Sequence, residues 1–265
     1  MQAEINDHAL NYILKGADDG LPVVFIHGFP FSHRMWDPQL AALPIKYRAI
    51  AYDVRGHGQS GVGEGQYTLE LFVDDLLGLL DYLDVSQAVV CGLSMGGYIT
   101  LRAVERHPER FLAMILCDTR SEADTNEARI KRAATIQIVR SYGAPAFAED
   151  FLKAVLAPHT FESQPDVVEM VRAMIISNTS LGICGTLLAL AARTDTTPSL
   201  TSMDLPALVL VGEQDALTPI DAAQRLQDHL PQAQLSIIPD SAHLSNLENP
   251  AAFNMALLSF LDSLE

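Results

Sequence analysis

A serine in a glycine-rich turn is the first residue of this sequence that could do covalent chemistry. Ser94 lies in Gly92-Leu93-Ser94-Met95-Gly96, which follows an apolar run ending at Cys91 and precedes a helical pattern over Tyr98 to His107. A G-x-S-x-G pattern between a strand and a helix is typical of a strained turn, in which glycines leave room where side chains would clash. The pattern predicts that Ser94 is a nucleophile.

A serine hydroxyl is a weak nucleophile and needs a base that a third group orients. Of the eight histidines, His243 is predicted to be the base, because its loop follows the last predicted strand and can reach the sheet edge where Ser94 points. Asp215 ends another predicted strand and lies between Ser94 and His243 in the sequence, which is the order this turn type requires. Asp118, directly after the apolar run ending at Cys117, is the alternative acid.

Attack by a serine creates an oxyanion that backbone N–H groups must stabilise. Met95, directly after the nucleophile, is expected to supply one of them. The other is expected from the turn His27-Gly28-Phe29-Pro30. Phe29 is the predicted donor there because Pro30 has no N–H. The Phe29–Pro30 bond is a candidate for the cis form, as X–Pro bonds are.

Short apolar runs alternate with helical patterns, which predicts an α/β fold with a buried, mainly parallel sheet. Thr68 and Thr218 are the expected N-caps of two of the helices, and Asn249-Pro250 is expected to open the last one. The predicted strands are His8–Leu14, Val23–Ile26, Ala49–Tyr52, Ala88–Cys91, Ala113–Cys117, Ala207–Val211 and Gln234–Ile238.

The alternation stops between Thr119 and Thr201, where only helical patterns occur. We therefore expect residues 1–118 and 202–265 to form one core domain and residues 119–201 an all-helical cap inserted between two strands. The helical patterns of this segment are Glu127–Tyr142, Pro145–Leu156, Pro165–Ser177 and Ile183–Arg193.

The composition excludes several classes of protein. Lys and Arg number 17 against 33 Asp and Glu, so the chain has a net charge of −16 and lacks the basic stripe that nucleic acid binding requires. No apolar run is long enough for a transmembrane helix, and the N-terminus does not resemble a signal peptide. Three cysteines do not make a disulfide framework. These features predict a cytoplasmic protein that binds neither nucleic acid nor membrane, and they do not separate a monomer from a homodimer.

No cofactor or metal is expected. Residues Gly56 to Gly61 fit G-x-G-x-x-G, but further glycines follow where a dinucleotide-binding helix would have to begin. The sequence has no Walker A pattern, no H-E-x-x-H and no paired C-x-x-C.

Four motifs in order make the chain resemble the α/β-hydrolase superfamily, in particular serine hydrolases with a helical cap. Besides the Ser94 turn, they are His27-Gly28, Asp53 to Ser60, and Gly212-Glu213-Gln214-Asp215 with the late His243. The resemblance implies a mainly parallel eight-stranded sheet with helices on both faces and the cap inserted after strand six. Similar hydrolases that open epoxides or remove halide carry a carboxylate at the position of Ser94. The serine at this position therefore favours acyl transfer to water.

The expected reaction is hydrolysis of carboxylic esters with small to medium acyl chains. The alternative is an enol-lactonase acting on a carboxylated lactone, because Ala242 to Glu248 is similar to the histidine segment of those enzymes, although the turn at His27-Gly28-Phe29-Pro30 differs from theirs. Perhydrolysis, C–C bond hydrolysis and a non-catalytic receptor are less favoured. A lactone carboxylate would need a cation above Ser94. If no cation faces inward, the enol-lactonase function is excluded. The candidate cations are Arg34, Arg120, Arg129, Lys131, Arg132 and Arg140.

Overall fold

Eight strands form one sheet, in the order β1-β2-β4-β3-β5-β6-β7-β8, in the computed structural model, which describes residues 1–264. Pairs β1–β2 and β2–β4 are antiparallel and the remaining pairs are parallel. The predicted fold class is confirmed, although the first strand was not predicted. The strands are β1 (Gln2–Ile5), β2 (His8–Gly16), β3 (Leu21–Ile26), β4 (Tyr47–Tyr52), β5 (Ala88–Leu93), β6 (Phe111–Cys117), β7 (Ala207–Gly212) and β8 (Ala233–Ile238).

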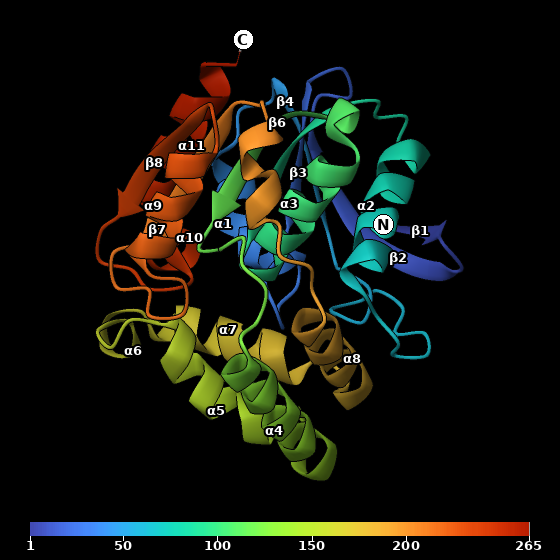
Figure 1. Ribbon diagram of the computed structural model, residues 1–265, viewed down its shortest axis with the longest axis vertical. Coiled ribbons are helices and arrows are strands. Elements are labelled where there is room, and N and C mark those ends of the chain that lie inside the picture. Colours follow the sequence, from blue (N-terminus) through green and yellow to red (C-terminus); the bar gives the residue numbers. More distant parts are fainter. Residues whose placement is uncertain (265) are drawn as a thin grey trace.

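Helices cover both faces of the sheet because its central strands are apolar on both sides (Figure 1). On β5, Val90 packs in the core that α2, α3 and α9 share, while Val89 and Cys91 pack in the core on the other face, with α1 and α11. The covering helices are α1 (Asp37–Ala42), α2 (Leu69–Tyr82), α3 (Met95–Arg106), α9 (Ile220–His229) and α11 (Pro250–Asp262), and the short α10 (Ser245–Glu248) precedes the last of them.

Five α-helices and a 3-10 helix, Thr197–Ser202, lie between β6 and β7, and the five α-helices are gathered below the sheet in Figure 1. The four predicted helices of this segment are present, within three residues of their expected bounds. The segment that leaves β6 and the segment that returns to β7 are joined by hydrogen bonds. The N–H and the hydroxyl of Thr196 both donate to the carbonyl of Ser121, at 3.1 and 3.2 Å. The helices are α4 (Asn126–Tyr142), α5 (Ala144–Val155), α6 (Thr160–Ser163), α7 (Pro165–Ile176) and α8 (Ser180–Ala191). The division into a core and a cap domain at the expected boundaries stays a prediction.

Two of the three expected helix starts are found and one is wrong. Thr68 caps α2 and Asn249 caps α11, each by accepting a backbone N–H. Helix α9, however, begins at Ile220 with Pro219 as its N-cap, and the Thr218 hydroxyl donates to Asp215 instead. The threonine was expected to cap because sequence spacing alone does not show a nearer carboxylate.

Among residues 1–264, no single helix is long and apolar enough to cross a membrane. Only α7 and α8 taken together pass that test of length and composition, and they meet at a bend of 92°.

Close backbone contact holds α3 against the sheet. A Cβ atom on Gly96 would lie 2.2 Å from the carbonyl oxygen of Ile26 in β3, and one on Gly92 would lie 2.2 Å from the carbonyl oxygen of Gly96. Backbone cannot give way as a flexible side chain can, so only glycine fits at these two positions. The glycines of the serine turn therefore set how closely α3 approaches β3 and β5.

Replacing Gly96 with alanine should destabilise the fold strongly. We expect Gly96→Ala to lower the free energy of unfolding by at least about 3 kcal/mol, because helix and strand must separate to admit the methyl group. Gly63→Ala is the control: Gly63 has a positive φ, which Gly96 does not, but nothing lies within 4 Å of its added Cβ, so the loss should be only about 1 kcal/mol. Urea unfolding measures both values, and equal losses would contradict this account.

Candidate active site

Ser94 lies on a sharp turn between β5 and α3, as predicted. Its backbone has φ 52° and ψ −109°, an unusual conformation for a residue with a side chain. The turn is fixed on both sides, because Ser94 N donates to the carbonyl of Cys117 at 2.9 Å and the Thr119 hydroxyl donates to the carbonyl of Ser94 at 2.8 Å. Strain that several contacts maintain is typical of functional turns.

The structure brings together the three side chains that the sequence singled out. His243 Nε2 lies 2.9 Å from Ser94 Oγ, and His243 Nδ1 lies 2.8 Å from Asp215 Oδ2. His243 follows β8 and Asp215 follows β7, so parallel strands deliver both residues to the edge where Ser94 stands. Both distances are hydrogen-bond distances, so a proton on Ser94 has a direct route to the imidazole.

Burial and charge act in opposite directions on this pair. Burial alone would lower the pKa of His243, but the negative charge of Asp215 and its hydrogen bond outweigh burial and raise that pKa above 6.5. Burial would likewise raise the pKa of Asp215, and the charge and hydrogen bond of His243, together with hydrogen bonds from Thr218, lower it instead. The aspartate is therefore an anion that stabilises the protonated imidazole.

Thr218 is a part of the site that sequence reasoning missed. Its hydroxyl donates to Asp215 Oδ2 at 2.5 Å and lies 3.2 Å from His243 Nδ1, while its N–H donates to Asp215 Oδ1 at 3.0 Å. The N–H of Leu217 gives the same oxygen a further bond at 2.8 Å. A threonine three residues after the candidate acid was the available signal, but it was assigned to the helix cap.

Asp118, the alternative acid, makes other contacts. Its Oδ1 accepts the N–H of Gly212 at 2.8 Å and its Oδ2 accepts the hydroxyl of Ser245 at 2.5 Å. Burial, followed by the charge of Asp215, raises the pKa of Asp118 well above its ordinary value. The described hydrogen bonds thus place Asp215, and not Asp118, on the imidazole of His243.

The backbone N–H groups of Phe29 and Met95, both near Ser94, have no acceptor among residues 1–264. Met95 begins α3, where the N-terminal N–H groups of a helix have no partner within the helix and favour negative charge. Phe29 follows β3, and its peptide bond to Pro30 is cis, the form that the sequence had left open. Both residues line the pocket that contains Ser94 and His243.

The pocket above Ser94 has a volume of about 450 Å³ and is lined by both apolar and charged side chains. The apolar lining includes Phe147 and Phe151 from α5 and Leu187 and Leu190 from α8. The charged residues of the lining are Arg120, Asp124, Lys131, Arg132 and Arg193.

Three of the six cations proposed from the sequence, Arg120, Lys131 and Arg132, line this pocket. Arg34, Arg129 and Arg140 are absent from its lining. Arg34 instead lies 3.8 Å from Asp37 at the surface. The condition that at least one candidate cation lines the pocket of Ser94 is therefore met.

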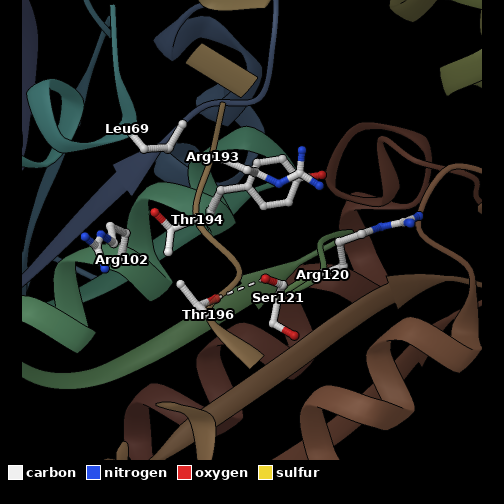
Figure 2. Close-up of a pocket in the computed structure, with 8 residues that line it drawn as sticks. Leu69, Arg102, Arg120, Ser121, Arg193, Thr194 and Thr196 are labelled. Carbon is white, nitrogen blue, oxygen red and sulfur yellow. Dashed lines mark hydrogen bonds between the residues drawn. The ribbon is translucent and has the colours of Figure 1, made fainter. Parts of the chain in front are cut away.

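Arg193 also lines the pocket and was not expected from the sequence. It pairs with Asp124, as Arg132 does, and its guanidinium lies 4.3 Å from the centre of the Tyr98 ring. Figure 2 shows Arg193 with Arg120 and the hydrogen bond between Thr196 and Ser121, around a neighbouring cavity. That cavity holds only about 10 Å³, room for about one water molecule.

Other features of the sequence have structural roles here. His27 and His57 are fully buried, and burial lowers their pKa values to about 4 and about 3, so neither competes with His243 as a base near neutral pH. The three cysteines are buried and free. Within residues 1–264, no group of three or more His, Cys, Asp and Glu side chains could hold a metal ion.

Comparison with known proteins identifies a family and relatives that include enol-lactonases and esterases. A family model described as the alpha/beta hydrolase fold matches residues 22–250. The chain is 33% identical over 251 residues to a 3-oxoadipate enol-lactonase of Acinetobacter baylyi, covering 95% of this chain and 92% of that protein. A solved thermophilic esterase from Thermogutta terrifontis with malate bound is 34% identical, with a TM-score of 0.95 over 100% of this chain and 98% of that one.

The enol-lactonase from Burkholderia xenovorans is similar in the same way, with 30% identity and a TM-score of 0.93 over 99% of this chain and 100% of that one. Family model, relatives and solved structures agree with the motifs and the sheet order. The chain therefore belongs to the α/β-hydrolase family of enzymes.

Proposed function

We propose that this protein hydrolyses carboxylic esters of small to medium acyl chain through an acyl-enzyme. The observation that carries the proposal is the chain of hydrogen bonds from Ser94 Oγ through His243 to Asp215, next to a pocket with two unpaired N–H groups. Nucleophile, base and orienting acid in this arrangement are the requirements for acyl transfer by serine.

In the first half of the reaction, Ser94 Oγ attacks the ester carbonyl and His243 Nε2 takes its proton. The N–H groups of Phe29 and Met95 stabilise the oxyanion, and Asp215 stabilises the imidazolium. His243 then gives the proton to the departing alcohol. In the second half, His243 takes a proton from water, whose oxygen attacks the acyl carbon on Ser94. His243 then returns the proton to Ser94 Oγ as the acyl–oxygen bond breaks, which releases the carboxylic acid and restores the hydroxyl.

The pocket supports a small to medium acyl chain. Its volume of about 450 Å³ lies at the lower end of the range for small-molecule sites. Phe147 and Phe151 stack on each other with ring centres 4.7 Å apart, and Phe29 lies about 6 Å from both. These aromatic rings form an apolar surface next to Ser94 on which an acyl chain can pack.

Removing the nucleophile or the base should abolish turnover of a short-chain p-nitrophenyl ester. We expect Ser94→Ala and His243→Ala each to lower kcat by at least about a thousandfold, because each loss disables the whole acyl-transfer step. Stopped assays of released nitrophenol on purified, folded variants measure this. Near-full activity in either variant would refute the proposed mechanism.

The pH dependence of activity should follow His243. A protonated imidazole cannot accept the Ser94 proton, so kcat/KM should fall as the pH drops through the raised pKa of His243, at a higher pH than for an ordinary histidine. In Asp215→Asn, burial is no longer opposed by that charge, so the pKa of His243 should move downward, which NMR titration of the imidazole detects. A flat activity profile down to pH 5 would contradict the assignment of the base.

A second candidate function is hydrolysis of a carboxylated enol-lactone. The observation that favours it is the charge of the pocket lining, which includes four cationic side chains and one carboxylate in a protein of net charge −16. Asp124 pairs with Arg132 and Arg193, whereas Lys131 and Arg120 have no carboxylate partner among the described residues. These two cations can attract a substrate carboxylate, and the enol-lactonase relatives support the same activity.

Substrate charge separates the two candidates. If the pocket serves a carboxylated substrate, Lys131→Ala should lower kcat/KM for monoethyl succinate about tenfold and leave diethyl succinate unchanged, because only the monoester offers a carboxylate to the lysine. Lys153→Ala is the matched control, since Lys153 is an exposed lysine of α5 outside the pocket lining. Equal effects of Lys131→Ala on both esters would exclude a carboxylate-binding role and leave the neutral-ester activity standing.

A further inference from the structure

A buried carboxylate lies directly behind the loop that carries His243. Glu248 is only 4% exposed, and it ends the short helix α10 that follows this loop. Its Oε1 accepts the N–H of Ala242 at 2.8 Å, while its Oε2 accepts the N–H of Ala157 at 2.7 Å and the hydroxyl of Thr160 at 2.6 Å. One side chain thus joins the histidine loop to the connection between α5 and α6.

These three donors replace a counter-ion. Among residues 1–264, no Lys, Arg or His forms an ion pair with Glu248, and a buried charge without one is tolerated only when hydrogen bonds satisfy it. The donors belong to two separate segments of the chain, so the carboxylate is satisfied only while the α5–α6 connection rests on the histidine loop. A bond of 3.1 Å from His243 N to the carbonyl of Val155 joins the same two segments.

A second buried side chain joins the helical segment to the turn that presents Phe29. Asn178, between α7 and α8, is 7% exposed. Its Nδ2 donates to the carbonyls of Pro30 and Met174 at 2.7 and 2.8 Å, and its Oδ1 accepts the N–H of Gly58 at 3.0 Å. Pro30 directly follows Phe29, so this bond fixes the turn on which the Phe29 N–H depends.

We propose that Glu248 and Asn178 are positioning residues, through which the helices between β6 and β7 hold His243 and the Phe29 turn in place for the reaction. The proposal rests on the function proposed above. Neither side chain touches the reacting atoms: Glu248 acts through the backbone of Ala242 and His243, and Asn178 acts through Pro30. Small displacements of groups that transfer protons or stabilise an oxyanion lower the rate more than they lower substrate binding.

Isosteric substitutions test this without changing the packed volume. Glu248→Gln removes the charge and turns one acceptor into a donor, and Asn178→Asp removes the donor to Pro30 while keeping the acceptor for Gly58. We expect each to lower kcat by at least about tenfold with KM changed by less than about threefold. Thr179→Ala is the control, because it removes the N-cap of α8 beside Asn178, and among residues 1–264 the Thr179 side chain has no hydrogen bond to either loop. Its kcat should stay within about threefold of wild type.

Hydrogen exchange supplies a readout that needs no substrate. Glu248→Gln should raise deuterium uptake in peptides covering residues 155–164 and 241–245 together, and Asn178→Asp should raise uptake in the peptide covering residues 28–31, because only the released segments open locally. Thr160→Val removes one donor to Glu248 and should give the same pattern of uptake as Glu248→Gln, but weaker. It replaces Glu248→Gln in this experiment if the Glu248→Gln variant does not fold.

The outcomes separate this proposal from the one on which it rests. Local uptake together with a lowered kcat supports positioning. Uptake spread over the whole chain, kcat within about threefold of wild type, or an equal loss in Thr179→Ala overturns it. Failure of the proposed function would show differently, as turnover that survives in Ser94→Ala.

Discussion

A carboxylate buried beside an imidazole sets requirements for everything around it. Asp215 and His243 are 5% and 3% exposed, so water cannot satisfy the charge and the protein must supply donors. It does so from one tight turn, in which the N–H groups of Leu217 and Thr218 and the Thr218 hydroxyl all point at Asp215. The imidazole is left with one nitrogen for Asp215 and one for Ser94, and so its orientation is determined by its two neighbours.

The parts of the site that could be predicted are those whose signals are local in sequence. Ser94 and Asp215 each follow an apolar strand and His243 follows the next one, and parallel strands bring their ends to one edge. Strand β1 was missed because four residues with exposed and buried positions alternating give little signal next to the longer apolar runs. Thr218 shows another limit of sequence-based prediction. Its position fits both an N-cap of α9 and a hydrogen-bond donor to Asp215, and only the distances in the folded protein decide between these two roles.

The residues that could not be predicted depend on contacts between distant segments. Glu248 meets Ala157 across 91 positions and Asn178 meets Pro30 across 148. Arg193 lines the pocket and pairs with Asp124, 69 positions earlier in the chain. Net charge says little about the pocket for a related reason. Charges farther apart than about 8 Å are largely screened at physiological salt, so a group in the pocket responds to the side chains that line it more than to the overall charge of −16.

The helices between β6 and β7 therefore affect the reaction in two ways: they line the pocket, and they position the loops that carry the reacting groups. Phe147, Phe151 and Leu187 face the pocket, and substitutions there change the surface that an acyl group contacts. Glu248 and Asn178 connect the same helices to the loops around Ser94, and substitutions there change the geometry of the reacting groups. Since α5 and the connection that follows it contribute to both, a change that shifts α5 to enlarge the pocket also moves Ala157 against the histidine loop. Altered acyl selectivity without loss of rate then requires pocket substitutions that leave the backbone of residues 155–160 in place.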